Sequence, residues 1–304
     1  MNDPGLSIGE GWQDLVTVLA SEPAPQRTYI IGGTDSGKST LCRYLTRELN
    51  AYGTTAYIDC DTGQSAIGPP TTVGLAITDR NVPATSLLRF VGATSPRGHL
   101  LQTLTGAKRL LETAVSAGAS AVILDSPGYI SGDAAFEFQF QMIDLLQPDH
   151  IVALQRGREL ERLLANFRRH PGIRIHRLGI SPAVITRPPA ERRRYREEKF
   201  RAYFVGAEVH EVSLRRLGLH GRVPDLRKPV QVHRRLVALC DRWNFAIALG
   251  VIGSADPETR RMQVLMPPVD RSRAASIQFG SLYLDLAAPP GEMESYSPFE
   301  ATRG

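Results

Sequence analysis

The stretch GGTDSGKS, residues 32–39, constrains the fold of this chain more than any other feature. It fits the pattern G-x-x-x-x-G-K-[ST], in which backbone N–H groups and a helix N-terminus surround a phosphate group. The β-rich apolar run before it predicts a buried strand, and the apolar spacing after it predicts a helix that stops at Gly53. A strand, this loop and a helix together are the setting of a P-loop, so we expect an α/β nucleotide-binding domain.

Each position of the loop has an expected role. Lys38 is expected to bridge the terminal phosphates, Ser39 to ligate Mg²⁺, and Thr40 to contact the α-phosphate. The predicted nucleotide-binding residues are Gly32, Gly33, Thr34, Asp35, Ser36, Gly37, Lys38, Ser39 and Thr40.

Two carboxylates follow in YIDCDTGQS, residues 57–65. Strand alternation places Asp59 and Asp61 on one face, where two acids are costly unless a cation lies in front of them. We expect Asp59 to hold the metal and Asp61 to act as general base, with the two roles interchangeable on sequence alone. Gln64 is expected to orient an attacking group or a metal-bound water. The alternative is that one of the aspartates caps a turn.

A third buried strand ends in LDSPGYI, residues 124–130. Ligands of α/β sheets bind at this edge, so Asp125 is a candidate second acid on the metal side. Tyr129 is a candidate platform on which a base stacks. The alternative for Tyr129 is packing beneath the loop.

The segment 191–204, ERRRYREEKFRAYF, predicts a charged helix. Arg192 and Arg196 are separated by four positions and therefore share a face. Two guanidinium groups facing the P-loop would neutralise a transferring phosphoryl group. An exposed charged helix is the alternative.

Charge is distributed unevenly along the chain, whose net charge is +5. Residues 1–155 carry 9 Lys and Arg against 15 Asp and Glu, residues 156–201 carry 14 against 5, and residues 202–304 carry 13 against 11. The middle block is either a solvated helix face or a polyanion-binding element. Because no apolar run is long enough for a membrane span, the N-terminus is acidic and the cysteines are few, we expect a cytoplasmic protein.

The pattern of elements predicts two domains. Strands alternate with helices, including helices at 98–118, 133–147 and 157–169, which indicates a parallel sheet covered on both faces. TGQSAIGPPTTVG, at 62–74, is expected to be a loop. From about residue 206 short β-like runs replace the helices. We therefore predict an α/β P-loop domain over 1–205 that includes the arginine-rich helix, and a small all-β domain with a frayed tail over 206–304.

The order of these motifs resembles that of the polynucleotide 5′-hydroxyl kinases, the RNA kinases related to the mRNA cleavage factor subunit and the pre-ribosomal-RNA processing kinase. The resemblance runs from about residue 27 to about residue 285. It rests on the P-loop, the D-x-D-x-G-Q pattern, SPGY where the family has T-x-G-W, and the R-x-x-x-R helix. With only about 26 residues before the first strand, the family's N-terminal β domain is not expected.

The resemblance implies a function and a set of site residues. ATP with Mg²⁺ would bind at Lys38 and Ser39, and Asp59, Asp61 and Gln64 would serve the metal and the nucleophile. The residues implied to clasp a nucleic acid are Ser126, Pro127, Gly128 and Tyr129, and those implied to form the lid are Arg192 and Arg196. The γ-phosphate would pass to the 5′-OH of RNA, DNA or both.

Two other functions compete with this one. A P-loop NTPase switch would hydrolyse nucleotide, but VALQRGREL stands where a guanine-specific protein has N/T-K-x-D. A non-catalytic ATP-binding scaffold in RNA processing would have no need of the intact lysine, acids and lid arginines.

Overall fold

The computed structural model describes residues 9–79 and 82–296. The chain forms two compact units. The first unit comprises Met1–Asp61, Val73–Leu87 and Pro96–Arg187, and the second comprises Thr62–Thr72, Leu88–Ser95 and Pro188–Gly304. The predicted frayed tail largely lies outside the described residues.

The first unit is built on a seven-stranded sheet with the order β4-β3-β2-β5-β1-β6-β7. Its strands are β1 (Gln26–Gly32), β2 (Thr55–Asp59), β3 (Thr72–Asp79), β4 (Val82–Phe90), β5 (Ala121–Asp125), β6 (His150–Gln155) and β7 (Arg174–Gly179). The five strands from β2 to β7 in this order pair in parallel, and β3 pairs with β2 antiparallel. The prediction of an α/β fold with a mostly parallel sheet is confirmed.

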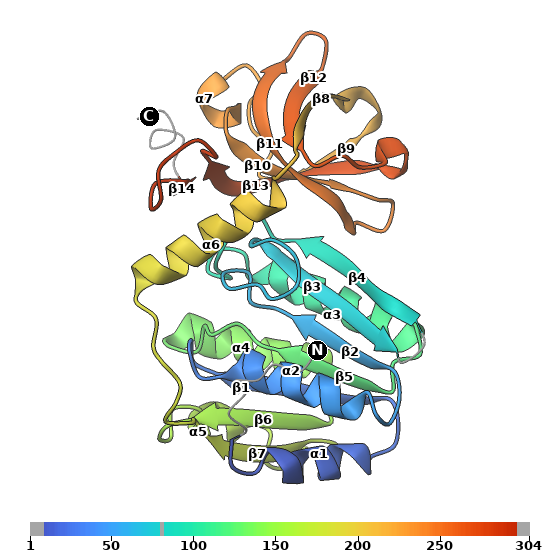
Figure 1. The fold of residues 1–304 in the computed structure, drawn as a ribbon, viewed down its shortest axis with the longest axis vertical. Coiled ribbons are helices and arrows are strands. Elements are labelled where there is room, and N and C mark those ends of the chain that lie inside the picture. The colour runs from blue at the N-terminus through green and yellow to red at the C-terminus, as the bar shows by residue number, and fades with distance from the viewer. Residues whose placement is uncertain (1–8, 80–81, 297–304) are drawn as a thin grey trace. The chain divides into compact units, whose positions relative to one another are not determined.

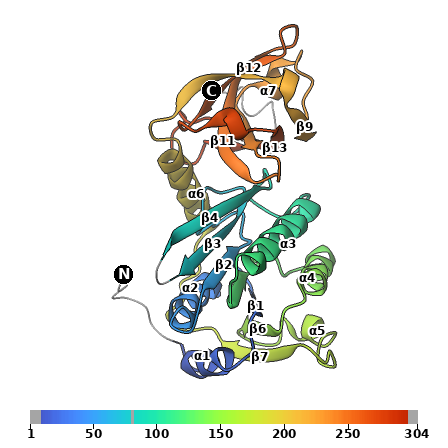
Figure 2. The same ribbon diagram turned by 90° about the vertical axis from the view of Figure 1, so that its right-hand side faces the viewer.

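Helices cover both faces of this sheet, as Figures 1 and 2 show. On one face lie α1 (Trp12–Ala20) and α2 (Lys38–Leu49); on the other lie α3 (Leu100–Ser116), α4 (Asp133–Leu146) and α5 (Glu161–Leu164). Every residue of the central strands β2 and β5 is buried. Burial from two sides explains why those strands are almost continuously apolar instead of alternating.

Two predicted elements differ from the structure. The predicted helix at 157–169 is reduced to the four residues of α5, because the Glu159 carboxylate accepts the backbone N–H groups of Arg156 and Gly157 and holds the preceding segment as a loop. The predicted loop at 62–74 ends earlier than expected, since β3 begins at Thr72 and pairs with β2.

The second unit contains a β sheet with the order β14-β13-β10-β11-β12-β8, with β9 paired to β13. Its strands are β8 (Glu208–Ser213), β9 (Gly218–Gly221), β10 (Arg235–Cys240), β11 (Ala246–Asp256), β12 (Arg261–Met266), β13 (Ser276–Leu284) and β14 (Glu294–Ser295). The single-turn helix α7 (Pro229–Val232) lies between β9 and β10. The predicted β-rich C-terminal region is therefore observed.

The predicted domain boundary needs correction. Helix α6 (Pro189–Tyr203), expected to belong with the P-loop, is part of the second unit. Its Phe200 and the following Phe204 are buried in one apolar cluster with side chains of β10, β11 and β13. Because this packing attaches α6 to the β structure, the division of the chain lies at residues 187 and 188 instead of 205 and 206.

Candidate active site

The P-loop joins β1 to α2 and has the backbone geometry of an anion-binding nest. Asp35 (φ 53°) and Gly37 (φ 88°) adopt left-handed conformations, which turn successive N–H groups toward one point at the start of α2. The Lys38 side chain is buried, and its Nζ donates to the Gly33 carbonyl over 2.8 Å. The predicted loop residues therefore converge at the N-terminus of α2 in a form that fits a phosphate group.

The connection between β7 and α6 lies against this loop, a contact that the sequence analysis did not predict. The Asp35 carboxylate accepts the backbone N–H of Arg187 over 3.0 Å. A Cβ on Gly37 would stand 3.4 Å from Cγ2 of Val184. The connection between β7 and α6 is therefore held to the P-loop by a P-loop side chain.

Three aspartates lie at the carboxyl edge of β2 and β5, beside the P-loop. Asp59 and Asp125 are directly paired in the sheet register. Ser39 Oγ donates to Asp125 Oδ2 over 2.6 Å, and Tyr57 Oη donates to the same oxygen over 3.1 Å. The structure thus links the P-loop serine to Asp125, whereas the sequence pattern favoured Asp59 as the principal metal ligand.

Asp61 does not continue strand β2, which ends at Asp59. The Asp61 backbone N–H donates to Asp59 Oδ1 over 3.0 Å, so Asp59 caps the turn that carries Asp61. Asp59 is buried and Asp61 is half-buried. The alternation argument for the pair is therefore wrong, although both acids remain at the edge of the sheet beside the P-loop.

The environment of Asp125 fits a divalent cation. The side chain is fully buried, and this burial raises its pKa from 3.8 to about 6, against the lowering effects of the Lys38 ammonium and the Ser39 hydrogen bond. Its Oδ1 has no hydrogen-bond partner among the described residues. A buried carboxylate with an unsatisfied oxygen beside a serine hydroxyl is a suitable pair of ligands for Mg²⁺, which needs only one or two carboxylates besides substrate phosphates.

The predicted clasp turn touches the P-loop directly. A Cβ on Gly128 would stand 2.8 Å from the Thr34 backbone nitrogen, so only glycine fits at this contact. Thr34 Oγ1 also donates to the Gly128 carbonyl over 3.4 Å. Ser126 and Pro127 are buried, which leaves Gly128 and Tyr129 as the partly exposed members of the turn.

The ring of Tyr129 packs against neighbouring side chains, and its role as a stacking platform stays a prediction. It packs at 6.3 Å between centroids from Phe138, and the Arg97 guanidinium lies 5.9 Å from its centroid. The ring is half-buried, so a part of it is accessible to a ligand.

Gln139, a buried residue of α4 that sequence reasoning missed, fastens this turn. Its Nε2 donates to the carbonyls of Pro127 and Tyr129 over 3.1 and 3.0 Å. Its Oε1 accepts from Tyr29 Oη over 2.6 Å. The available signal was a glutamine among the buried positions of an amphipathic helix, where an amide must find partners.

We expect Gln139→Leu to loosen the clasp turn, because leucine keeps the volume but removes the amide that bonds one hydroxyl and two carbonyls. Each such group costs about 1–3 kcal/mol if it stays buried. Thermal unfolding should show a lower Tm. Gln141→Leu is the matched control, since Gln141 is exposed on the same helix and bonds Glu137. Equal unfolding temperatures for the two variants would contradict the role of Gln139.

The predicted lid helix is α6, and one of its two predicted lid arginines pairs with a carboxylate of β14. Arg196 forms a bidentate ion pair with Glu294 through contacts of 2.9 and 3.0 Å, with 16% and 5% of the two side chains exposed. Burial raises the pKa of Glu294, and Arg196 opposes that shift. Arg192 is half-buried.

Gln64 lies in Thr62–Thr72, which belongs to the second unit together with α6.

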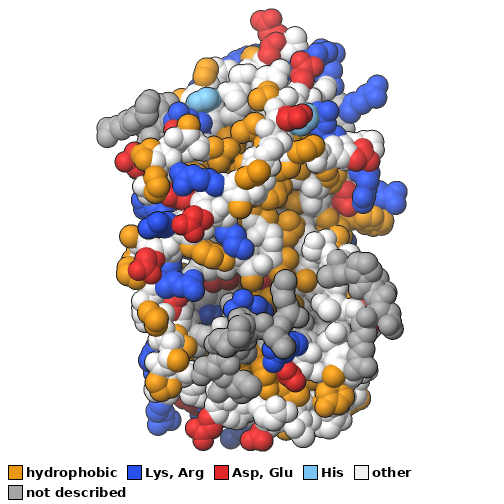
Figure 3. Space-filling view, viewed as in Figure 1, with side chains coloured by type: hydrophobic (Ala, Val, Ile, Leu, Met, Phe, Trp, Pro, Cys, Tyr) orange, Lys and Arg blue, Asp and Glu red, His pale blue; other side chains and the backbone are white. Residues whose placement is uncertain are grey.

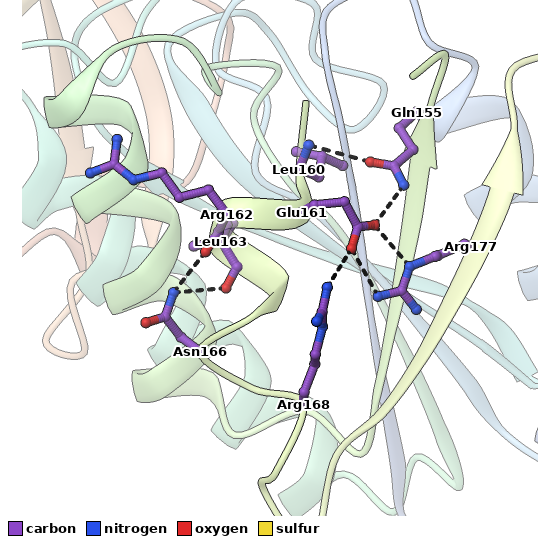
Figure 4. Close-up of polar contacts among 8 residues, drawn as sticks. All are labelled: Gln155, Leu160, Glu161, Arg162, Leu163, Asn166, Arg168 and Arg177. Atoms are coloured by element: carbon purple, nitrogen blue, oxygen red, sulfur yellow. Dashed lines mark hydrogen bonds and ion pairs between the residues drawn. The ribbon is translucent and has the colours of Figure 1, made fainter. Parts of the chain in front are cut away.

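The basic block at 156–201 is not one surface. It spans the end of β6 to α6, and Figure 4 shows Glu161 binding Gln155, Arg168 and Arg177. The Arg177 hydrogen bonds lower the pKa of Glu161 to about 2. Arginines of the block paired with carboxylates include Arg162, Arg168, Arg174, Arg177, Arg194 and Arg196. On the face that Figure 3 views, acidic side chains lie between basic ones.

A P-loop with its lysine and serine, set beside aspartates at the carboxyl edge of a parallel sheet, defines a P-loop nucleotide-binding protein. The model of the mRNA cleavage and polyadenylation factor CLP1 P-loop family matches residues 32–206. This chain belongs to that family.

Curated relatives resemble the chain over most of their length. A protein of Thermococcus kodakarensis named polyribonucleotide 5′-hydroxyl-kinase is 28% identical, with 88% of this chain and 91% of the relative covered. A protein of the same name from Methanocaldococcus jannaschii is 26% identical, with 91% and 92% covered. Clp1p solved in complex with Pcf11p shares the fold, with a TM-score of 0.68, 14% identity, and 90% and 78% of the two chains covered.

None of the helices in the described part of the chain is long and apolar enough to cross a membrane.

Proposed function

We propose that this protein is an ATP-dependent polyribonucleotide 5′-hydroxyl kinase, a phosphotransferase with an alcohol group as acceptor. The observation that carries the proposal is the likeness, over 91% and 92% of their lengths, to two relatives that bear that name. The intact P-loop lysine and the Ser39–Asp125 hydrogen bond support it. The cytoplasm is the proposed location.

On the nucleotide side, Lys38 and the loop N–H groups bind and orient the phosphates of ATP. Ser39 and Asp125 would hold Mg²⁺, together with Asp59 directly or through water. A cation held there would supply charge neutralisation for the nucleotide phosphates. We add Asp125 to the metal ligands predicted from the sequence, Ser39 and Asp59, because Asp125 is the acid that Ser39 contacts.

On the acceptor side, the partner is a nucleic acid with a free 5′-OH. The 5′ oxygen attacks the γ-phosphorus, the bond between that phosphorus and the β–γ bridging oxygen breaks, and ADP leaves. Asp61 accepts the proton of the 5′-OH, because it is the more exposed of the pair and stands on a turn that Asp59 holds. Tyr129 stacks on the terminal base, and Gly128 brings the turn against the P-loop.

Transfer of label from γ-labelled ATP to 5′-OH oligonucleotides, measured beside release of free phosphate, tests the function. We expect the label to appear in RNA that has a free 5′-OH and not in RNA whose 5′ end is blocked. Phosphate release without labelled RNA would indicate an NTPase, and neither product would indicate a nucleotide-binding scaffold; both results overturn the proposal. A parallel reaction with DNA of the same sequence defines the acceptor range.

The two lid arginines should respond differently to substitution. Arg192→Ala is expected to lower kcat by about tenfold or more, because its guanidinium serves the transferring phosphoryl group. Arg196→Ala should also lower Tm, since it leaves the buried Glu294 carboxylate without its cation. Steady-state kinetics and thermal unfolding of both variants decide this. A wild-type kcat for Arg192→Ala would contradict the lid assignment.

A further inference from the structure

The turn between β10 and β11 presents an exposed tryptophan. Trp243 is 56% exposed, whereas the chain's other tryptophan, Trp12, is 5% exposed in the first unit. A single exposed apolar side chain is ordinary by itself, so its surroundings decide whether it has a role.

The turn that carries Trp243 is held in one conformation. Asp241 Oδ1 accepts the backbone N–H groups of Trp243 and Phe245 over 2.8 and 2.9 Å. Arg89 Nη1 donates to the carbonyls of Trp243 and Asn244 over 3.0 and 2.6 Å. An indole on a fixed turn loses little freedom when a ligand stacks on it.

One arginine lies against this indole, and two more contact the turn that carries it. The Arg242 guanidinium lies 5.3 Å from the Trp243 ring, and Arg89 lies 5.9 Å from the Phe245 ring. Arg273, 73% of whose side chain is exposed, stands 4.0 Å from Asp241. Asp241 itself is 7% exposed and accepts hydrogen bonds within the turn, so the solvent-exposed side chains of the turn include an aromatic ring and the Arg242 guanidinium beside it.

We propose that the β10–β11 turn is a second RNA-contact site, at which a base stacks on Trp243 while Arg242 and Arg273 bind the flanking phosphates. An accessible ring with adjacent cations is the arrangement that binds single strands with little sequence preference. A protein partner is disfavoured because the side chains around the indole are charged instead of apolar. The proposal rests on the proposed function, because the ligand is taken to be the single-stranded RNA substrate. The site would bind nucleotides of that RNA beyond its 5′-terminal one.

The test uses the whole protein and a 5′-phosphorylated oligoribonucleotide of about 20 nucleotides, which cannot accept a phosphoryl group. Fluorescence anisotropy of labelled RNA should show Trp243→Ala binding at least about fivefold more weakly, and Trp243→Phe keeping most of the affinity because a ring remains. The double variant Arg242→Ala with Arg273→Ala should bind RNA with a weaker salt dependence. The slope of log K against log salt concentration should become shallower by roughly 0.7 for each phosphate that the variant no longer binds. Tyr52→Ala is the control, since Tyr52 is a 68% exposed aromatic residue of the first unit.

A direct signal comes from tryptophan emission. RNA should quench the emission of the wild-type protein and leave that of Trp243→Phe, which reports Trp12 alone, nearly unchanged. Wild-type affinity for Trp243→Ala together with unquenched emission would overturn the RNA site and leave the turn as a candidate protein contact. Weaker RNA binding by Trp243→Ala in a protein that proves not to phosphorylate RNA would overturn the proposed function but leave this site standing.

Discussion

Lys38→Ala is expected to lower phosphoryl transfer by about 10³-fold or more and to weaken ATP binding. Phosphoryl transfer depends on positioning and on neutralising charge, and Lys38 is the cation of the P-loop itself. In the structure its Nζ donates to the Gly33 carbonyl, a contact within the loop that also helps to hold the loop closed. Label transfer to a 5′-OH oligoribonucleotide and titration with a fluorescent ATP analogue measure the two effects.

Arg47→Ala is the matched control for Lys38→Ala. Arg47 lies on the same helix, α2, but is exposed and pairs with the adjacent Glu48, so its replacement should leave transfer unchanged. Lys38→Arg should restore little activity, because a guanidinium differs from an ammonium in shape and donor geometry. Activity near that of the wild type in Lys38→Ala would refute the P-loop assignment.

Asp61→Asn should reduce transfer by ~10²–10⁴-fold while ATP binding survives, since general-base assistance contributes about that factor. Asparagine keeps the shape of the side chain but does not accept a proton. The decrease is expected in kcat, measured with both substrates saturating, and the Kd for the ATP analogue should stay within about twofold of the wild-type value.

Asp59 provides the comparison that separates the two acids. Asp59→Asn retains an oxygen that accepts the Asp61 N–H, so the turn should persist and the defect should appear as a higher Mg²⁺ requirement. Asp59→Ala removes the cap and should lower Tm as well. If Asp59→Asn had a reduced kcat at saturating Mg²⁺ while Asp61→Asn kept that of the wild type, the two roles would be reversed.

The P-loop was predictable because its contacts are local. Its glycines, lysine and serine lie within eight consecutive residues, and the flanking strand and helix follow from periodicity. The parallel sheet followed from the alternation of strands and helices, and the β-rich region from the change of pattern near residue 206. These features depend on residues near one another in the chain, so a single sequence reports them.

The remaining parts of the site depend on residues far apart in the chain. Ser39 and Asp125 meet because β1 and β2 both pair with β5, and Gly128 meets Thr34 for the same reason. Gln139 and Glu294 are ordinary polar residues in the sequence, and only their burial shows that one fastens the clasp turn and the other binds Arg196. The assignment of α6 to the P-loop domain was wrong, since only packing shows where Phe200 and Phe204 are buried.

By itself the sequence determined the nucleotide-binding loop, the class of fold and the order of motifs that resembles the RNA kinases. Only the tertiary structure decided which acid the P-loop serine contacts, which residues hold the clasp turn, to which unit the lid helix belongs and that Arg89 fixes the turn carrying Trp243. The physical reason is that local motifs depend on backbone conformation and short spacing. The second group depends on burial and on hydrogen bonds between segments that the sheet and the core bring together.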